Sequence, residues 1–110
     1  MNKDYSVKKS SDIEKIIKKR KSVGNTHFVV YKSENHEETH FRFAVSVPKK
    51  FGNAVHRNKI KRQIREIMAK LDVIDKIDVF IVVKKNANEL DFEQIKKSIT
   101  WLMNKQNILR

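Results

Sequence analysis

Eight basic residues and no acidic residue lie between Thr39 and Arg65. Arginine and lysine side chains at this density suit the binding of phosphate, through ion pairs and charge-assisted hydrogen bonds. Because the stretch cannot neutralise itself, we expect its counter-charge on another molecule, and nucleic acid is the first partner to consider. The eight are Arg42, Lys49, Lys50, Arg57, Lys59, Lys61, Arg62 and Arg65.

The densest part of this stretch has helical spacing. An apolar stripe with the steps i, i+4, i+7, i+8 and i+11 predicts a helix from about residue 54 or 56 to residue 71. On that helix Arg57, Lys61 and Arg65 form one row beside the stripe, with Asn58 and Arg62 in the next row out. A solvated helix face normally mixes charges of both signs, so like charges in one row favour the binding of an anion. The stripe consists of Ile60, Ile64, Ile67, Met68 and Leu71.

A turn with the sequence Phe51-Gly52-Asn53-Ala54 precedes the predicted helix. Backbone N–H groups at a helix N-terminus bind anions, and Lys49, Lys50 and Arg57 flank this turn. We therefore predict that phosphate contacts converge on the turn.

The segment His36-Glu37-Glu38-Thr39-His40 matches the H-E-x-x-H pattern of zinc proteases. That chemistry requires both imidazoles on one face of a buried helix, together with a third ligand. The segment follows polar residues and leads at once into strand-like alternation, so we interpret it as a solvated hairpin loop.

Other candidates for catalysis have simpler explanations. His27 and His56 lack a partner at a suggestive spacing, and we interpret both as surface or phosphate-facing residues. The acids Asp72, Asp75 and Asp78 recur every three residues between the basic helix and a strand. Helix termination and solvation explain these acids, and the sequence contains no carboxylate cluster of the kind that a magnesium nuclease needs.

Hydrophobic periodicity predicts the elements that position the basic face. Ser11-x-x-Glu14 is a capping box that opens a first helix, with Ile13, Ile16 and Ile17 on one stripe, and Gly24-Asn25 ends it. Strands are predicted over residues 27–32 and 41–47, with a central strand over 77–83, and a last amphipathic helix carries Phe92, Ile95, Ile99, Leu102 and Met103. The order is helix, two or three strands, helix, strand, helix, which predicts an α+β layer sandwich.

Composition restricts the class of protein. A chain of 110 residues suggests one domain over residues 1–110, and 25 basic against 13 acidic residues give a net charge of +12. The sequence has no cysteine, which excludes zinc fingers and disulfide frameworks and fits a reducing compartment. We expect no signal peptide, no transmembrane segment and a cytoplasmic location.

One long spaced motif runs through the basic stretch: Ser46-x-x-Lys49-Lys50-x-Gly52-x-Ala54-Val55-x-Arg57-Asn58-x-x-Lys61-Arg62-x-x-Arg65-Glu66. It resembles the signature of the bacterial ribonuclease P protein subunit, and the resemblance extends over nearly the whole chain. It implies a two-layer sandwich of the ribosomal S5 domain 2-like type, with a central mixed four-stranded sheet, the order α-β-β-β-α-β-α and a left-handed crossover. It also implies a subunit of an endonuclease that removes the 5′ leader of precursor tRNA, inactive alone because catalysis resides in an RNA.

The resemblance assigns partners and site residues. It implies binding to the catalytic RNA and to precursor tRNA, with magnesium held mainly by the RNA and no protein oligomer required. The residues implied to bind the catalytic RNA are Lys49, Lys50, Asn53, Arg57, Asn58, Lys59, Lys61, Arg62 and Arg65. Those implied to contact the leader are Ile13, Ile17, Val29, Tyr31 and Ser46. Many relatives carry Phe at the two helix positions, and because isoleucine cannot stack on a base, Tyr31 is the main candidate ring.

Two other functions are weighed beside this one. A ribosomal-type RNA-binding protein would bind RNA without stimulating the cleavage of precursor tRNA. A DNA-binding regulator would place the basic helix in a major groove, but a strand precedes that helix where a helix-turn-helix would have a helix.

Overall fold

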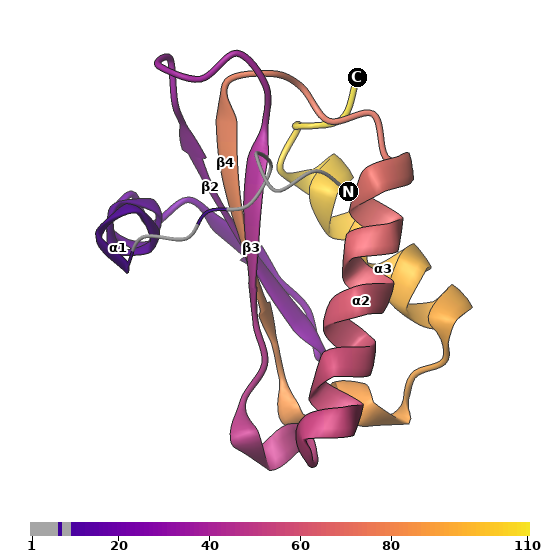
Figure 1. Cartoon of the computed structure of the whole chain (residues 1–110). Helices are drawn as coiled ribbons and strands as arrows, with labels where there is room; N and C mark the ends of the chain where they lie inside the picture. The colour runs from indigo at the N-terminus through magenta and orange to yellow at the C-terminus, as the bar shows by residue number, and fades with distance from the viewer. Residues whose placement is uncertain (1–6, 8–9) are drawn as a thin grey trace.

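A four-stranded mixed sheet forms the centre of the computed structural model, which describes residue 7 and residues 10–110 (Figure 1). The strand order is β1-β2-β4-β3. β1 (Ser22–Gly24), β2 (Phe28–Glu34) and β4 (Ile77–Val83) are antiparallel neighbours, whereas β3 (Arg42–Ser46) runs parallel to β4. Together with α1 (Ser10–Lys18), α2 (Ala54–Lys70) and α3 (Phe92–Lys105), these strands confirm the predicted order of elements.

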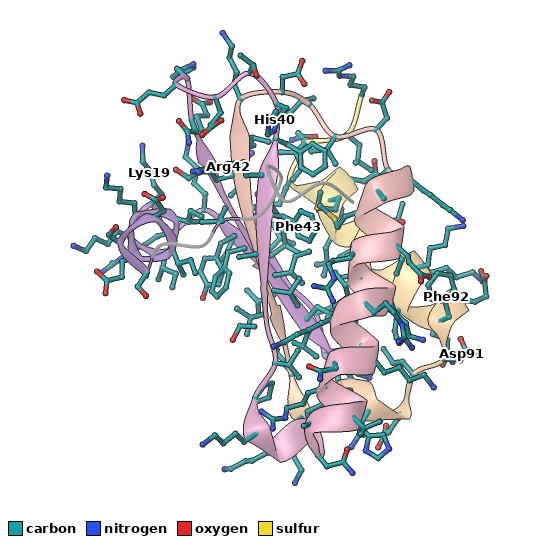
Figure 2. All side chains as sticks on the ribbon, in the orientation of Figure 1. Lys19, His40, Arg42, Phe43, Asp91 and Phe92 are labelled. Carbon is teal, nitrogen blue, oxygen red and sulfur yellow. The ribbon has the colours of Figure 1, made fainter. Side chains whose placement is uncertain are left out.

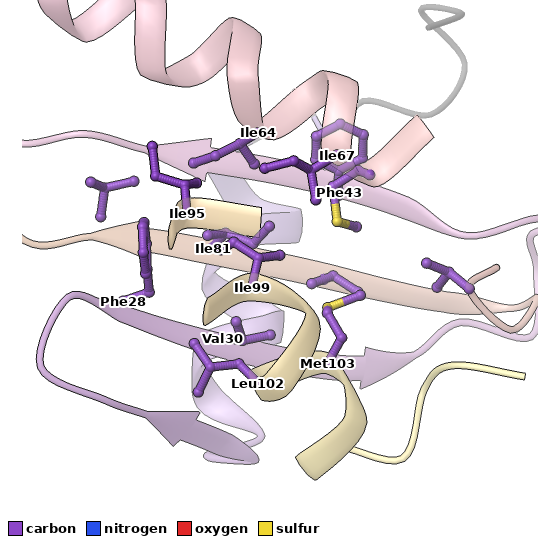
Figure 3. Packing of buried hydrophobic residues seen from close by; sticks show 14 of the residues in the cluster. Phe28, Val30, Phe43, Ile64, Ile67, Ile81, Ile95, Ile99, Leu102 and Met103 are labelled. Atoms are coloured by element: carbon purple, nitrogen blue, oxygen red, sulfur yellow. The ribbon is translucent and has the colours of Figure 1, made fainter. Parts of the chain in front are cut away.

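The helices α2 and α3 cover one face of the sheet. Their apolar stripes meet alternate residues of the strands, as Figure 3 shows for Ile64 and Ile67 of α2 and for Ile99 of α3. The strand residues on this face are fully or almost fully buried, as expected where successive side chains point to opposite faces of a sheet. They include Phe28, Val30, Phe43, Val79, Ile81 and Val83.

The opposite face of the sheet is only partly covered, by α1. Val7 and Ile16 pack there against Phe80 of β4 and form a smaller second cluster. Because β4 lies between β2 and β3 and is covered on both faces, its nearly continuous apolar sequence is explained, which confirms its prediction as a central strand.

The N-terminus of α2 is fixed by the turn that precedes it. The 3₁₀ turn η2 (Lys49–Phe51) leads through Gly52 to Asn53, whose Oδ1 accepts a hydrogen bond from the backbone N–H of His56 at 3.0 Å. A Cβ on Gly52 would lie 3.1 Å from the Cβ of His56, so glycine allows the turn to pass close to the helix.

The predicted limits of the first helix are wrong in the structure. α1 begins at Ser10, so Ser11 lies inside its first turn, and α1 ends at Lys18, well before Gly24. Residues 22–24 form β1 instead, a strand too short to show periodicity. Asn25 caps the β1–β2 turn rather than a helix, because its Oδ1 accepts hydrogen bonds from the N–H groups of His27 and Phe28, each at 2.9 Å.

Candidate nucleic-acid interface

The basic row predicted on α2 lies beside the apolar stripe of the helix, and two of its members, Lys61 and Arg65, face β3 and α1. Arg57 and Lys61 are half-buried beside the apolar stripe, while Arg62 and Arg65 are exposed. Lys61 and Arg65 line a groove of about 500 Å³ together with residues of β3 and α1. This placement confirms the row that the helical spacing predicts. Lys61 and Arg65 of the row lie toward the partly covered face of the sheet.

Seven of the eight cations in the acid-free stretch lack a carboxylate partner. Among residues 7 and 10–110, no Asp or Glu oxygen lies within 4.0 Å of Lys49, Lys50, Arg57, Lys59, Lys61, Arg62 or Arg65. In addition, the Nε atom of Arg57 is buried and has no hydrogen-bond partner in the described part of the chain. Like charges placed in a row without counter-charges repel one another, and a bound polyanion would relieve that repulsion.

Arg42 is the exception among the eight, and its counter-charge is internal. Its guanidinium binds both carboxylate oxygens of Asp78, with Nε–Oδ1 at 3.0 Å and Nη2–Oδ2 at 2.8 Å. Glu38 lies 3.5 Å from the same guanidinium and Asp12 lies 4.0 Å from it. The hydrogen bond to Asp78 raises the pKa of Arg42, against the opposing effect of burial, and the three carboxylate charges add to the increase.

This network corrects two predictions. The expectation that the whole stretch finds its counter-charge on another molecule is wrong for Arg42. The interpretation of Asp78 as a solvated residue is also wrong, since Asp78 is only 5% exposed. Figure 2 shows the reason: Arg42 and Phe43 are neighbours on β3 and point to opposite faces, Arg42 toward α1 and Phe43 toward α2. Asp72 and Asp75, by contrast, are exposed and lie 3.9 and 2.7 Å from the guanidinium of Arg110.

Lys59 is separated from the other cations of α2. It lines a different cavity of about 420 Å³ between α2 and the N-terminal end of α3, together with His56, Gln63 and Phe92. The remaining predicted residues near the helix start, Lys49, Lys50 and Asn53, are exposed. The side-chain oxygen of Asn53 is already used as the helix cap.

The residues predicted to contact a leader lie on the α1 side of the sheet. Ile13 packs with Tyr31 against Phe80, and the rings of Tyr31 and Phe80 are 6.1 Å apart between centroids. Ile13 and the exposed Ser46 line the groove that also contains Lys61 and Arg65. The structure therefore brings two of the five residues together with the basic row.

The other three residues of the predicted leader set lie outside that groove. Tyr31 and Val29 are half-buried on β2, and Ile17 is 40% exposed on α1, one turn beyond Ile13. They belong to the same partly covered side of the sheet, since Val29 and Tyr31 alternate with the buried Phe28 and Val30.

The H-E-x-x-H segment lies in the loop between β2 and β3, which confirms the prediction of a loop, but the loop is not a hairpin because β4 lies between these two strands in the sheet. His36 and Glu37 are exposed there and no helix forms. Within the described residues, no group of three or more His, Cys, Asp or Glu side chains is placed to hold a metal ion.

Comparison with known proteins decides the family. The sequence profile described as Ribonuclease P matches residues 1–107. The chain belongs to the ribonuclease P protein family. The ribonuclease P protein component of Macrococcus caseolyticus (strain JCSC5402) is 43% identical over 104 residues, which cover 94% of this chain and 90% of that protein. The corresponding protein of Acholeplasma laidlawii (strain PG-8A) is 40% identical and covers 99% of this chain and 95% of its own.

Solved structures agree with the family assignment. The RNase P protein of Staphylococcus aureus superposes with a TM-score of 0.89 at 39% identity, covering 96% of this chain and 98% of that one. The RNase P protein of Thermotoga maritima superposes with a TM-score of 0.82 at 28% identity, covering 91% and 96%. The mixed sheet with three helices matches these structures, which confirms the predicted fold class.

Family membership settles the general function. The chain is a subunit of ribonuclease P, an RNA-based endoribonuclease that processes tRNA, and its partner is the ribonuclease P RNA. A ribosomal-type RNA-binding role is not favoured by these comparisons. No helix in residues 7 and 10–110 has the length and apolar character needed to cross a membrane.

Proposed function

We propose that the basic row of α2, formed by Arg57, Lys61 and Arg65, binds the ribonuclease P RNA while the groove beside it receives the 5′ leader of precursor tRNA. The observation that supports this proposal is that residues of both predicted sets line one groove. Lys61 and Arg65 of α2 face Ile13 of α1 and Ser46 of β3 across it. A single strand in this groove would meet cations on one side and apolar or hydroxyl groups on the other, the combination that suits single-stranded RNA.

The proposal divides the predicted RNA contacts into three groups. Arg57, Asn58, Lys61, Arg62 and Arg65 share the flank of α2 that faces the groove or solvent beside it, and they would contact RNA phosphates and sugars. Lys49, Lys50 and Asn53 precede this flank and would extend the contact beyond the N-terminus of α2. Lys59 lies on the other flank and would contact a separate part of the RNA.

The leader would continue from the groove across the open part of the sheet. Tyr31 offers its ring there, Val29 lies two residues before it on the same face, and Ile17 extends the apolar edge of α1. Of these residues only Tyr31 can stack on a base, so we place the main leader contact at this ring. The proposal assigns magnesium mainly to the RNA component, since the chain belongs to the family of an RNA-based endoribonuclease.

Reconstitution tests the proposal. The purified protein alone should cleave nothing, and together with a bacterial ribonuclease P RNA at low magnesium it should restore leader removal. Affinity for precursor tRNA should increase with leader length until the groove is filled. Affinity for mature tRNA, which has no leader, should be the same for wild type and Tyr31→Ala. If Tyr31→Ala weakened mature and precursor tRNA equally, the leader would not lie on this face.

A further inference from the structure

The outer face of α3 carries an aromatic and basic surface that the proposed function does not use. Trp101 is the only tryptophan of the chain and is 49% exposed. Lys97 and Lys105 lie one helical turn before and after it, so the three side chains form one row. We name these three residues the α3 surface.

The packing of α3 determines where this surface points. Ile95, Ile99, Leu102 and Met103 face the sheet and are buried (Figure 3). At 100° per residue Lys97 and Trp101 lie opposite this stripe, so the α3 surface faces away from the sheet. The groove beside α2 lies over β3 and α1, whereas α3 contacts β1 and β2, so the two surfaces are distinct.

The charge around Trp101 resembles that of the α2 stretch. From Gln94 to the last residue the sequence contains no Asp or Glu and four cations, Lys96, Lys97, Lys105 and Arg110. Arg110 pairs with Asp75, but no carboxylate of the described residues lies within 4.0 Å of the three lysines. Glu93 precedes Lys97 by one turn, and the two form no such ion pair.

A further cation reaches the same side of the molecule through the β1–β2 turn. Asn25 donates a hydrogen bond to the Ser98 hydroxyl at 2.6 Å, and Lys84 Nζ donates to the Asn25 carbonyl at 2.8 Å. Ser98 lies on the flank of α3, so this chain of contacts holds the exposed Lys84 beside the helix. Lysine side chains therefore lie on more than one flank of α3.

We propose that the α3 surface is a second RNA-binding surface, which binds a single-stranded RNA segment by stacking one base on Trp101. Lys97 and Lys105 are separated by about 12 Å along the helix axis, at 1.5 Å per residue, so their long side chains flank the base and reach the phosphates on either side. In the free protein the Lys105 ammonium lies 5.4 Å from the centre of the Trp101 ring. When a base covers the ring, this ammonium pairs with a phosphate instead.

Other occupants fit the α3 surface less well. A second copy of the chain would place lysine against lysine, with a charge of +12 on each molecule. A lipid surface would need several apolar side chains, but Trp101 is the only exposed large hydrophobic residue on α3. A base with a phosphate on either side would stack on the Trp101 ring and pair with both lysines at the same time.

The test uses the single tryptophan as its own reporter. The full-length protein is titrated with an unstructured oligouridylate of about 12 nucleotides, and with inorganic polyphosphate of equal charge as a probe that has no base to stack. The oligouridylate should quench the Trp101 fluorescence, and polyphosphate should leave it nearly unchanged. Equal quenching by both probes, or none by either at saturation, would overturn the proposal.

Variants separate stacking from charge. Trp101→Ala should weaken oligouridylate binding about five-fold or more, as expected for the loss of one stacked base, while Trp101→Phe should retain part of the affinity. Lys97→Gln with Lys105→Gln should lower the salt slope of binding by about 1.4, with Lys70→Gln and Lys76→Gln together as the control that removes the same charge. Unchanged affinity in Trp101→Ala would contradict the proposal, even if another surface bound the oligonucleotide.

Failure of this proposal can be distinguished from failure of the proposed function. Assembly with the ribonuclease P RNA and leader removal are measured for the same variants and for Arg62→Ala with Arg65→Ala. Normal assembly by the α2 variant would count against the proposed function alone. Normal oligouridylate binding by Trp101→Ala would count against the α3 surface alone.

Discussion

Arg42 and Asp78 are register partners on the parallel strands β3 and β4, and their side chains form a two-point ion pair on the α1 side of the sheet. Asn35 donates a third hydrogen bond to the same carboxylate at 3.1 Å. The pair therefore links β4, β3 and the loop that joins β2 to β3. Asp12 of α1, at 4.0 Å from Arg42, connects the helix to the same network.

The first prediction concerns the stability that this pair provides. Arg42→Leu leaves the Asp78 carboxylate buried without its cation, so we expect a loss of about 3 kcal/mol in the free energy of unfolding. Urea denaturation measures the loss. The matched variant Arg42→Leu with Asp78→Leu removes both charges and should recover most of it, because a buried pair replaced by apolar residues is often nearly neutral. Wild-type stability in the single variant would contradict the prediction.

The same pair should be insensitive to pH near neutrality. Because the pKa of Arg42 is raised in the folded state, its contribution is fully present below the unfolded-state pKa and is lost only as the pH rises through the folded-state pKa. Both values lie far above neutral. The stability difference between wild type and Arg42→Leu should therefore be constant from about pH 6 to about pH 9. A difference that shrinks within this window would assign the effect to another group.

The second prediction separates folding from RNA binding at Asn53. Asn53→Ala removes the cap of α2 and should cost about 1 kcal/mol of stability. Asn53→Asp keeps an oxygen at the cap and places a negative charge at the positive end of the helix, so its stability should equal or exceed that of wild type. The same charge would repel RNA phosphates, so the affinity for the ribonuclease P RNA should fall in the aspartate variant. Thermal unfolding and filter binding of both variants measure the two effects.

Local patterns in the sequence were sufficient for the long elements. The stripe that begins at Ile60 predicted α2 and the direction of its cations, and the apolar run from Ile77 predicted a central strand. These elements depend on periodic burial, which is written in consecutive residues. The basic row of the candidate site could be predicted in the same way, since the spacing of Arg57, Lys61 and Arg65 places them in one row on a single helix.

Features that depend on distant partners could not be predicted. β1 has three residues, and its turn is fixed by Asn25, which contacts Ser98 at a separation of 73 residues. The pairing of Arg42 with Asp78 depends on the register of two parallel strands that are joined through α2. A signal was nevertheless present, because Asp78 is the single acid in an apolar strand, where an unpaired charge would be costly.

The third prediction tests the flank of α2 that we propose to face the RNA. Arg62→Ala with Arg65→Ala removes two exposed cations without touching the apolar stripe, so the fold should be unchanged. Assembly with the ribonuclease P RNA should weaken, and the salt slope of assembly should decrease by roughly 1–2 because two phosphate contacts are lost. Lys70→Ala with Lys76→Ala removes the same charge from exposed positions outside the proposed interface and serves as the control. Equal effects of both pairs would indicate that only net charge matters.

The fourth prediction concerns Ile13 and Ile17, the two positions of α1 that we propose to contact the leader. Ile17 is 40% exposed, so Ile17→Phe can add a ring without displacing packed atoms. We expect this variant, assembled with the ribonuclease P RNA, to bind leader-bearing precursor tRNA about five-fold more tightly, corresponding to about 1 kcal/mol from one stacked base. Binding of mature tRNA, which lacks the leader, should stay the same. Ile13 packs against the buried cluster that contains Ile16 and Phe80, so Ile13→Phe should instead cost about 1–3 kcal/mol of stability through overpacking. An equal gain for precursor and mature tRNA in Ile17→Phe would place the new ring away from the leader.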